Sequence, residues 1–297
     1  MENRKEHGVA AINRQSFGQK MKSYVRHPGS LLLLILVLAA AILTVGILVF
    51  LVGYILIRGI PYLRPSLFAW EYNSENVSML PAMINTLSMT LLALLLSVPF
   101  GVGAAIYLVE YAKKGNRLVE MVRVTAETLS GIPSIIYGLF GMLFFVTALK
   151  WGYSMLAGAA TLAIMVLPVI MRTTEEALLC VPDSFREGSF GLGAGKLRTI
   201  FKVVLPTAIP GILSGIILAI GRIVGETAAL IYTSGTVASA AGLFDSGRTL
   251  AIHMYSLSRE GMHTNEAYAT AVILLIVVLI INGLSSLIAK KFEAPKQ

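Results

Sequence analysis

The sequence has 297 residues, of which 56% are hydrophobic and 13% charged, and its mean hydropathy is +0.77. Soluble domains of this length do not reach such values, so the composition excludes a soluble globular protein and indicates an integral membrane protein. The net charge of +8 comes mainly from connections between apolar runs. It therefore indicates membrane orientation and not a nucleic-acid partner.

Six apolar runs are each long enough to cross the roughly 30 Å hydrocarbon layer, which takes about 20 helical residues. The first, Gly29 to Ile57, has no charged residue and is longer than the apolar core of a signal peptide. We therefore predict an all-α integral membrane protein in contact with lipid, with six transmembrane helices at residues 29–57, 81–109, 128–149, 151–171, 206–233 and 268–289.

The distribution of Lys and Arg predicts which side of the membrane each connection occupies. These residues are more frequent in the tails 1–28 and 290–297, in the second-to-third connection and in the loop 172–206 than in the alternate connections. An excess of Lys and Arg stays on the cytoplasmic side. Both termini and the 172–206 loop are therefore predicted to be cytoplasmic.

The third run opens with SGIPSIIYGLFG, from Ser130 to Gly141. Pro133 lacks a backbone donor and therefore bends or starts a helix, while Ser134 and Tyr137 offer hydroxyl groups. Broken membrane helices with small polar groups often hold the substrate of a transporter. Ser134 and Tyr137 are therefore candidates for a translocation path, although a packing kink in an ordinary helix explains the same residues.

The fifth run contains two charged residues, Arg222 and Glu226, which lie one helical turn apart on one face if the helix continues. A charge in the hydrocarbon layer is costly, so Arg222 must face protein or water. Two interpretations remain. The residues form a structural ion pair, or they belong with Thr227 to a translocation path in which Arg222 donates hydrogen bonds to an oxyanion.

The same run carries two glycine pairs at the GxxxG spacing that lets membrane helices approach closely. The neighbouring helix can belong to this chain or to a second subunit. The predicted packing residues are Gly211, Gly215, Gly221 and Gly225.

The charged, glycine-rich stretch REGSFGLGAGKLRTIFKVVLP, from Arg186 to Pro206, is exceptional in this apolar chain. It is not a P-loop, because Phe190 stands where the first glycine belongs and Leu197 follows Lys196 where Ser or Thr is required. The residues instead predict a short helix after Pro182 and then a glycine break. We expect Asp183 and Ser184 to cap this helix, and Gly191, Gly193 and Gly195 to permit the turn into a membrane helix.

The spacing in this stretch resembles the cytoplasmic EAA loop of ABC importer permeases, in which E-A-A, three residues, Gly and nine residues precede I-x-L-P. Gly188, Ser189 and Val203 replace the two alanines and the isoleucine. The resemblance implies a coupling helix that docks on an ATPase subunit, whereas a solvated amphipathic loop is the alternative. The residues of the predicted docking loop are Glu187, Gly188, Ser189, Phe190, Gly193, Leu205 and Pro206.

Four stretches together are similar to the permease subunits of the bacterial Pst phosphate importer: GIPSIIYG, LPVIMRTTEEAL, the docking loop and GRIVGETAAL, whose end favours the PstA type. The resemblance implies a type I ABC importer permease fold in the bacterial inner membrane. It also implies a heterodimer with a PstC-type permease, two PstB-type ATPase subunits that hold ATP and Mg²⁺, and an extracytoplasmic phosphate-binding protein. If the roles in that family apply here, the resemblance implies that Glu187 and Gly193 belong to the ATPase-docking loop. It likewise implies that Arg222 and Glu226 belong to the translocation region.

Other functions fit less of the sequence. A PstC-type partner or a permease for another oxyanion has similar motifs, while a secondary transporter has six spans and buried charges but no use for the docking loop. The four histidines show no metal-ligand spacing. We therefore expect no catalytic residue, no metal and no cofactor bound by this chain.

Overall fold

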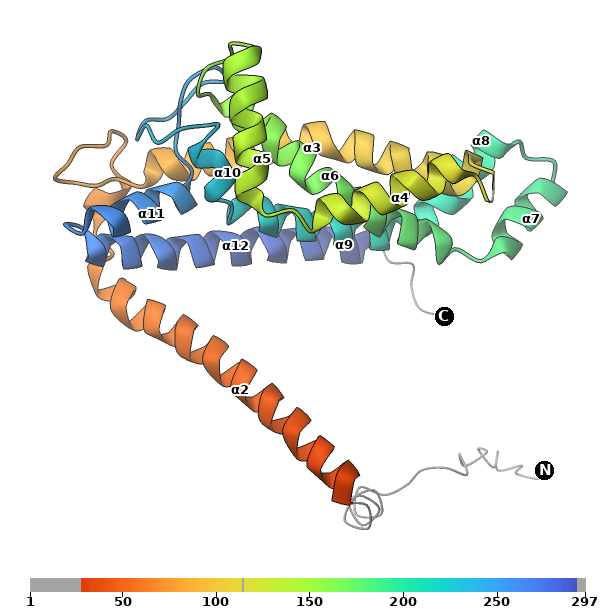
Figure 1. The fold of residues 1–297 in the computed structure, drawn as a ribbon, viewed down its shortest axis with the longest axis horizontal. Coiled ribbons are helices and arrows are strands. Elements are labelled where there is room, and N and C mark those ends of the chain that lie inside the picture. Colours follow the sequence, from red (N-terminus) through yellow and green to blue (C-terminus); the bar gives the residue numbers. More distant parts are fainter. Residues whose placement is uncertain (1–27, 114, 293–297) are drawn as a thin grey trace, which may run out of the picture. The chain divides into compact units, whose positions relative to one another are not determined.

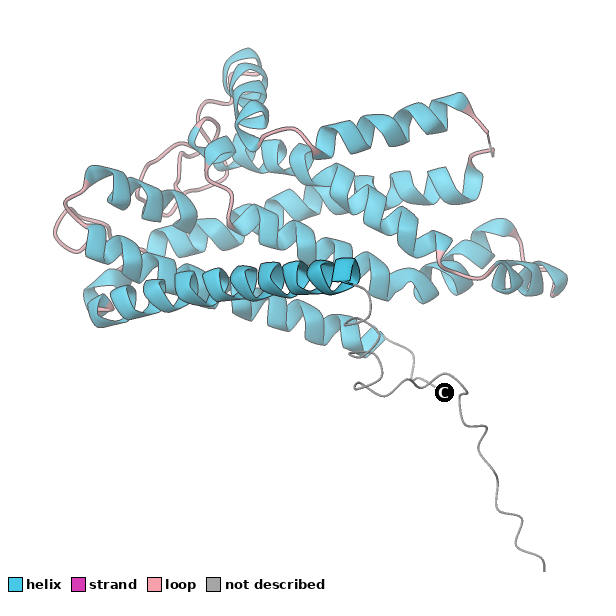
Figure 2. Cartoon of the chain, turned by 60° about the horizontal axis from the view of Figure 1, so that its bottom comes forward, coloured by secondary structure: helices cyan, strands magenta, loops and turns pink. Residues whose placement is uncertain are grey.

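The computed structural model describes residues 28–113 and 115–292, which form helices, turns and loops without a strand among them (Figures 1 and 2). The α-helices are α2 (Pro28–Gly59), α3 (Leu80–Ile106), α4 (Arg117–Ser130), α5 (Ser134–Gly141), α6 (Met155–Leu179), α7 (Asp183–Gly191), α8 (Lys196–Thr199), α9 (Leu205–Val224), α10 (Ala228–Ile231), α11 (Leu250–Glu260) and α12 (Thr264–Phe292). Short 3-10 turns are η1 (Ile60–Tyr62) and η2 (Pro65–Phe68), and π-helical turns are η3 (Tyr107–Tyr111), η4 (Met142–Ala148) and η5 (Ile200–Val204).

Among the described residues, five helices are long and apolar enough to cross a membrane: Pro28–Tyr62, Leu80–Tyr111, Met155–Leu179, Lys196–Val224 and Thr264–Ala289. A sixth crossing exists if α4 and the α5–η4 segment form one broken span, with a bend of 102° between them. The break falls at residues 131–133, because Pro133 has no backbone donor and disfavours a helical residue before it. The predicted third run is therefore divided, and its first residues belong to α4.

The chain divides into two units, one ending at Tyr54 and one beginning at Ile55. In the first unit, the described residues 28–54 form one helix without a charged residue, and its large side chains are exposed, as at Leu33 and Ile42. An exposed apolar helix of this length is suited to contact lipid.

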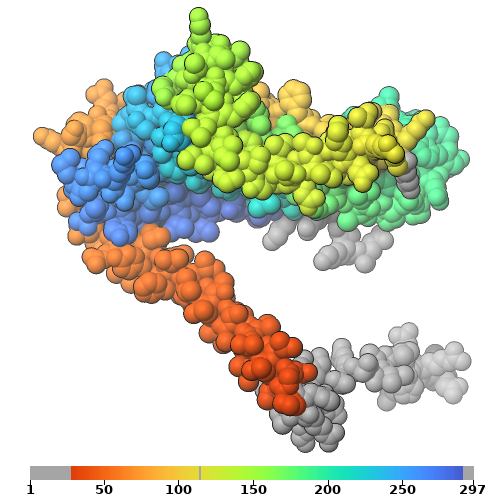
Figure 3. All heavy atoms as spheres, viewed as in Figure 1, coloured from red at the N-terminus to blue at the C-terminus, as the bar shows by residue number. Residues whose placement is uncertain are grey.

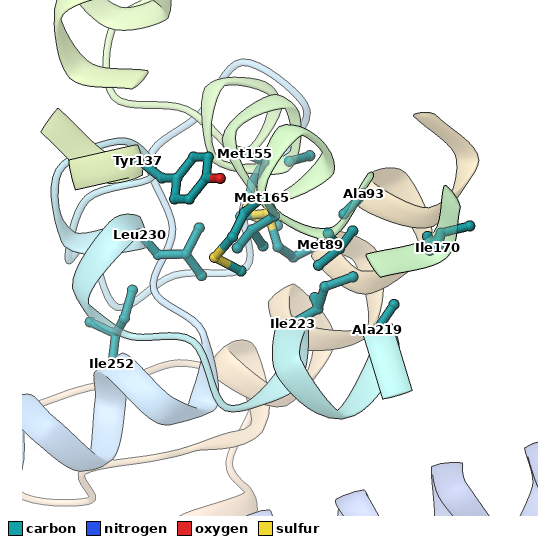
Figure 4. Close-up of a cluster of buried hydrophobic side chains, with 13 residues drawn as sticks. Met89, Ala93, Tyr137, Met155, Met165, Ile170, Ala219, Ile223, Leu230 and Ile252 are labelled. Carbon is teal, nitrogen blue, oxygen red and sulfur yellow. The ribbon is translucent and has the colours of Figure 1, made fainter. Parts of the chain in front are cut away.

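The second unit is built around α6, which packs between α3 and α9. Figure 4 shows the centre of this core, where Met89 of α3, Met165 of α6 and Ile223 of α9 meet. The same cluster takes in Tyr137 of α5 and Leu230 of α10. Helices far apart in the sequence thus share one apolar core.

Small residues bring these helices into close contact. A Cβ atom on Gly101 of α3 would lie 2.9 Å from Ile170 Cγ2 of α6. A Cβ atom on Gly138 of α5 would lie 2.7 Å from the Cα atom of Ala229 on α10. Backbones can approach this closely only where the side chain is absent. The α5–η4 segment starts at this contact and stands out from the side of the bundle (Figures 1 and 3).

The end of the second unit opposite α7 is closed by the loop between α10 and α11, together with α11 itself (Figure 1). The buried amide of Asn85, on α3, holds this loop. Its Oδ1 accepts from Ala241 N at 3.0 Å, and its Nδ2 donates to Ser239 O and Arg248 O at 2.8 and 3.1 Å. One side chain therefore satisfies three backbone groups of a loop that is more than 150 residues away in the sequence.

Candidate docking loop and translocation path

The short helix predicted after Pro182 is present as α7. The expected capping by Asp183 and Ser184 is wrong, because the N-cap position is Pro182 and no side-chain hydrogen bond caps the helix. Proline suits a helix start, since the first backbone donors of a helix lack intrahelical partners. Asp183 instead lies in the first helical turn, and its Oδ1 accepts from Arg186 Nη1 at 3.3 Å.

The turn that follows α7 is formed at Gly193. Gly193 has φ of +80°, a left-handed conformation that glycine adopts without the Cβ clash of other residues. Gly193 N donates to Phe190 O at 2.9 Å, and Ala194 N donates to Ser189 O at 3.1 Å. Of the three glycines expected to permit the turn, only Gly193 has a positive φ, since Gly191 ends the helix and Gly195 is extended.

The surface of α7 and its C-cap, which carries the predicted docking residues Glu187, Gly188 and Phe190, is largely open. Phe185 and Phe190 are each 47% exposed, and Leu192 is 91% exposed. Glu187 and Gly188 are also exposed. Apolar side chains that gather on such a surface mark contact sites for other proteins or for a membrane. The loop thus offers apolar anchors and one carboxylate beside each other.

The loop returns to the bundle through a continuous helix. Ser189 Oγ and Thr199 Oγ1 lie 2.8 Å apart and join α7 to α8, and the helix from α8 through η5 to α9 has no break. Leu205 and Pro206 therefore lie inside it. The wide turn of η5 ends at Val204, two residues before Pro206, which cannot donate a backbone hydrogen bond.

The two glycine pairs of α9 have different surroundings. A Cβ atom on Gly211 would lie 2.6 Å from Ala177 Cβ, and one on Gly215 would lie 1.9 Å from Thr173 Oγ1. This pair packs against α6 of the same chain. In contrast, a Cβ atom on Gly221 would meet nothing within 4 Å, and one on Gly225 would meet only the Gly221 carbonyl oxygen. Within the described residues, the second pair faces no other helix.

The structural ion pair considered for Arg222 and Glu226 is not formed among the described residues. Helix α9 ends at Val224, so the spacing of four residues no longer places both side chains on one helical face. Glu226 is buried, and its Oε1 accepts from Ala229 N at 3.0 Å at the start of α10. Arg222 is half-buried in the last turn of α9, about 24 Å along the helix from Pro206 at about 1.5 Å per residue.

Tyr137 has a structural contact that the sequence did not indicate. Its hydroxyl donates to Leu129 O at 2.8 Å across the bend between α4 and α5, and its side chain is buried. Ser134 begins α5 and is half-buried. Tyr137 therefore fastens the bend between α4 and α5.

Thr227 lines a cavity of about 650 Å³ between α5, α10, α11 and α12. Hydroxyl groups and one guanidinium, that of Arg259, share its wall with apolar side chains. Ser134, Tyr137 and Arg222 do not line it. The candidate path residues thus fall into two neighbouring places: the bend with Tyr137, and the cavity beside Thr227.

The sequence analysis missed the ion pairs at the α7 end of the bundle. Arg186 Nη2 lies 2.9 Å from Glu110 Oε1, and Arg123 Nη2 lies 2.5 Å from Glu175 Oε1. In each pair the carboxylate is at most 10% exposed. The sequence feature that could have indicated these pairs is a carboxylate at the end of an apolar run, because a buried charge needs a partner of opposite charge. The spacing of residues along the chain does not identify that partner.

Comparisons with known proteins agree with this architecture. Residues 97–294 match the family described as binding-protein-dependent transport system inner membrane component. The probable ABC transporter permease protein YqgI of Bacillus subtilis is 34% identical over 285 residues, which cover 86% of this chain and 95% of that protein.

Two further relatives carry a substrate in their names. The phosphate transport system permease protein PstA 1 of Mycobacterium tuberculosis is 42% identical over 154 residues, 52% of this chain and 50% of that protein. The phosphate transport system permease protein PstA of Yersinia pestis is 37% identical over 204 residues, 67% of this chain and 68% of that protein.

Solved structures share the fold. A bacterial ABC transporter for alginate import has a TM-score of 0.68 at 16% identity, covering 93% of this chain and 100% of that chain. The MetNI methionine ABC transporter has a TM-score of 0.59 at 22% identity, covering 71% and 94%. The fold is that of a type I ABC importer permease. By the family match over most of its length, this chain belongs to the binding-protein-dependent transport system inner membrane components.

Proposed function

We propose that this chain is the transmembrane permease subunit of an ATP-driven inorganic phosphate importer. The observation that carries the proposal is the exposed α7 helix and its Gly193 turn, which lead through one unbroken helix to Arg222. A docking surface is thereby connected mechanically to a charged group inside the apolar bundle. The names of the PstA relatives support phosphate as the substrate.

The anion would follow a path beside Arg222. A guanidinium offers several N–H donors in a fixed plane, which suits the oxygens of an oxyanion. Tyr137 holds the bend between α4 and α5 through its bond to Leu129 O, and Thr227 lines the cavity beside α10. Glu226 holds the start of α10 through Ala229 N, so its role is to shape the path, with Ser134 at the start of α5. The chain supplies a path and coupling but no bond-breaking chemistry.

The partners follow from the same proposal. A PstC-type permease forms the other half of the path, and two PstB-type ATPase subunits bind ATP and Mg²⁺ and dock on α7. An extracytoplasmic phosphate-binding protein delivers the anion. A solved alginate transporter was crystallised with its ligand-bound periplasmic protein, which supports this arrangement. The complex lies in the bacterial inner membrane with the N and C termini in the cytoplasm.

The cycle we infer is alternating access. ATP closes the ATPase pair, which moves α7 and, through α9, opens the path outward so that the binding protein can release its anion. Hydrolysis returns the helices to the inward-open arrangement. No cofactor bound by this chain is required.

A second candidate is an ABC permease for another oxyanion, or a PstC-type subunit. It is favoured by the Bacillus subtilis relative, which covers more of this chain than the PstA relatives and whose name states no substrate. A secondary transporter fits less well, because it has no use for the exposed α7 surface.

The test is uptake of radiolabelled phosphate into proteoliposomes that hold this chain, the partner permease, the ATPase and the binding protein. We expect uptake only with enclosed ATP, and competition by arsenate but not by sulfate. If the assembled complex hydrolyses ATP but moves no phosphate, the assignment as an ABC permease would stand, and phosphate would be excluded as its substrate. Uptake that continues without ATP would contradict the proposal entirely.

Two substitutions test the assigned residues in that assay. Glu187→Lys reverses the exposed charge on α7 and should weaken ATPase docking, while the protein still inserts into the membrane. Arg222→Gln should reduce uptake while the complex assembles and hydrolyses ATP. Wild-type uptake by the Arg222→Gln variant would limit Arg222 to a structural role.

A further inference from the structure

Arg186 differs from its neighbours on α7 because its side chain points into the bundle. The side chain is 14% exposed, whereas Phe185 and Glu187 on either side are exposed. Its Nε and Nη2 donate to Glu110 Oε1 at 3.1 and 2.9 Å. Glu110 is itself 9% exposed and lies in η3, the turn that ends the α3 helix. Two charge-assisted hydrogen bonds therefore tie α7 to α3.

The same guanidinium also binds the end of α6. Its Nη2 donates to Leu178 O at 2.9 Å, and its Nη1 donates to Val181 O at 2.7 Å. Leu178 is in the last turn of α6, whereas Val181 belongs to the link between α6 and α7. Through Glu110 and Leu178, one side chain of α7 thus joins the ends of two bundle helices. Lysine cannot do the same, since its single ammonium lacks the planar fork.

A second side-chain contact joins α7 to a different part of the bundle, the α8–α9 helix. The contact between Ser189 and Thr199 joins α7 to α8, which continues into α9. Phe185 and Phe190 are each 47% exposed. Among the described residues, the side-chain hydrogen bonds that join α7 to the ends of α3 and α6 are those of Arg186.

The contribution of the Arg186–Glu110 ion pair to stability depends on how deeply the pair is buried. Exposed pairs contribute little to stability, but removing one partner of a buried pair leaves a charge without compensation. The nearby pair of Arg172 and Glu127 has comparable length, 3.2 Å, but its side chains are 51% and 67% exposed. It therefore provides a matched control from the same end of the bundle.

We propose that Arg186 and Glu110 form a positioning clamp that keeps α7 at a fixed place on the ends of α3 and α6, so that movement of α7 is transferred to both helices. The proposal rests on the function proposed above, in which α7 docks on an ATPase. Glu187 and Phe190 face that partner, whereas Arg186 faces the bundle and transmits the movement.

The transport assay compares Arg186→Gln, Arg186→Lys and Glu110→Gln with the control Arg172→Gln in the complete complex. We expect the first three to retain the ATPase subunit and ATP hydrolysis but to lose phosphate moved per ATP by at least about fivefold, the low end of coupling between two sites. Arg172→Gln should behave as wild type. Arg186→Lys should lie between wild type and Arg186→Gln, because it keeps the charge but not the fork.

Two results in this assay would overturn the clamp. One is a wild-type ratio of phosphate to ATP in both Arg186→Gln and Glu110→Gln. The other is loss of the ATPase subunit itself, which would make the pair part of the docking surface and not of transmission.

A second measurement does not depend on phosphate. Spin labels at Leu192→Cys, the C-cap residue of α7, and at Tyr107→Cys on η3, both exposed positions, report the distance between the two elements in a Cys180→Ser background. We expect one narrow distance distribution with and without ATP, and a broad distribution after Arg186→Gln. An equally narrow distribution in the Arg186→Gln variant would refute the clamp even if the transported anion proved to be another one.

Discussion

Gly215 of α9 lies so close to Thr173 of α6 that a Cβ atom on the glycine would be 1.9 Å from Thr173 Oγ1. Thr173 cannot retreat easily, because its hydroxyl donates to Val169 O at 2.9 Å in its own helix. The contact lies on the helix that connects the docking loop with Arg222.

We predict that Gly215→Ala separates α9 from α6 and destabilises the protein by about 1 to 3 kcal/mol, the usual cost of overpacking. Thermal unfolding of the detergent-solubilised chain measures the effect. The matched control is Gly221→Ala on the same helix, where a Cβ atom meets nothing within 4 Å. An unchanged melting temperature for Gly215→Ala would contradict the close packing.

Gly221→Ala also tests where the second glycine pair packs. The isolated chain should keep its stability, since alanine is the better helix former. If Gly221 packs against the partner permease, the same substitution should reduce recovery of the heterodimer in co-purification. Full recovery would show that this glycine faces lipid or the path.

Replacing Gly193 in the turn after α7 should cost conformational free energy, because its φ is +80°. Gly193→Ala places a Cβ atom in a left-handed conformation at a cost of about 1 to 2 kcal/mol, which lowers the equilibrium constant for forming the native turn about 5- to 30-fold. Co-purification of the ATPase subunit should fall accordingly. Gly195→Ala, at an extended position where a Cβ atom meets nothing within 4 Å, should not reduce it, and equal loss in both variants would exclude the turn as the cause.

Asn85 predicts a local effect at the opposite end of the bundle. Asn85→Ala leaves Ala241 N, Ser239 O and Arg248 O without their partner, at about 1 to 3 kcal/mol for each group that stays buried and unsatisfied. Limited proteolysis should then cut the loop between α10 and α11. Asn116→Ala removes only an exposed cap of α4 and should leave the loop resistant to protease.

His253 of α11 predicts a pH dependence of stability. Burial, with the nearby positive charge of Arg248, lowers the pKa of His253 to about 3. The unfolded chain binds this proton below pH about 6.5 and the folded chain does not, so stability is complete above that pH. It then falls by about 1.4 kcal/mol per pH unit as the pH decreases toward 3.

Thermal unfolding between pH 7 and pH 5 checks this dependence. His253→Phe should flatten the pH profile, whereas His263→Gln, at a less buried histidine, should leave its slope unchanged. A slope that persists in His253→Phe would place the titrating group elsewhere.

The helical class and the helix-and-turn geometry at residues 183–193 were predictable because they depend on local chemistry. Apolar runs of about 20 residues can satisfy their backbone groups in a membrane only as helices or closed barrels, and their length favoured helices. Pro133 and Gly193 act through their own backbone geometry. The break before α5 and the turn after α7 therefore follow from single residues.

Tertiary structure alone decided which side chains meet. The sequence places Glu226 one turn from Arg222, yet the end of α9 at Val224 turns its carboxylate to Ala229 N. Arg186 and Glu110 are 76 residues apart, and Asn85 binds a loop more than 150 residues away. Such partners are chosen by helix packing and by the need to satisfy buried polar groups, and neither leaves a fixed spacing in the sequence.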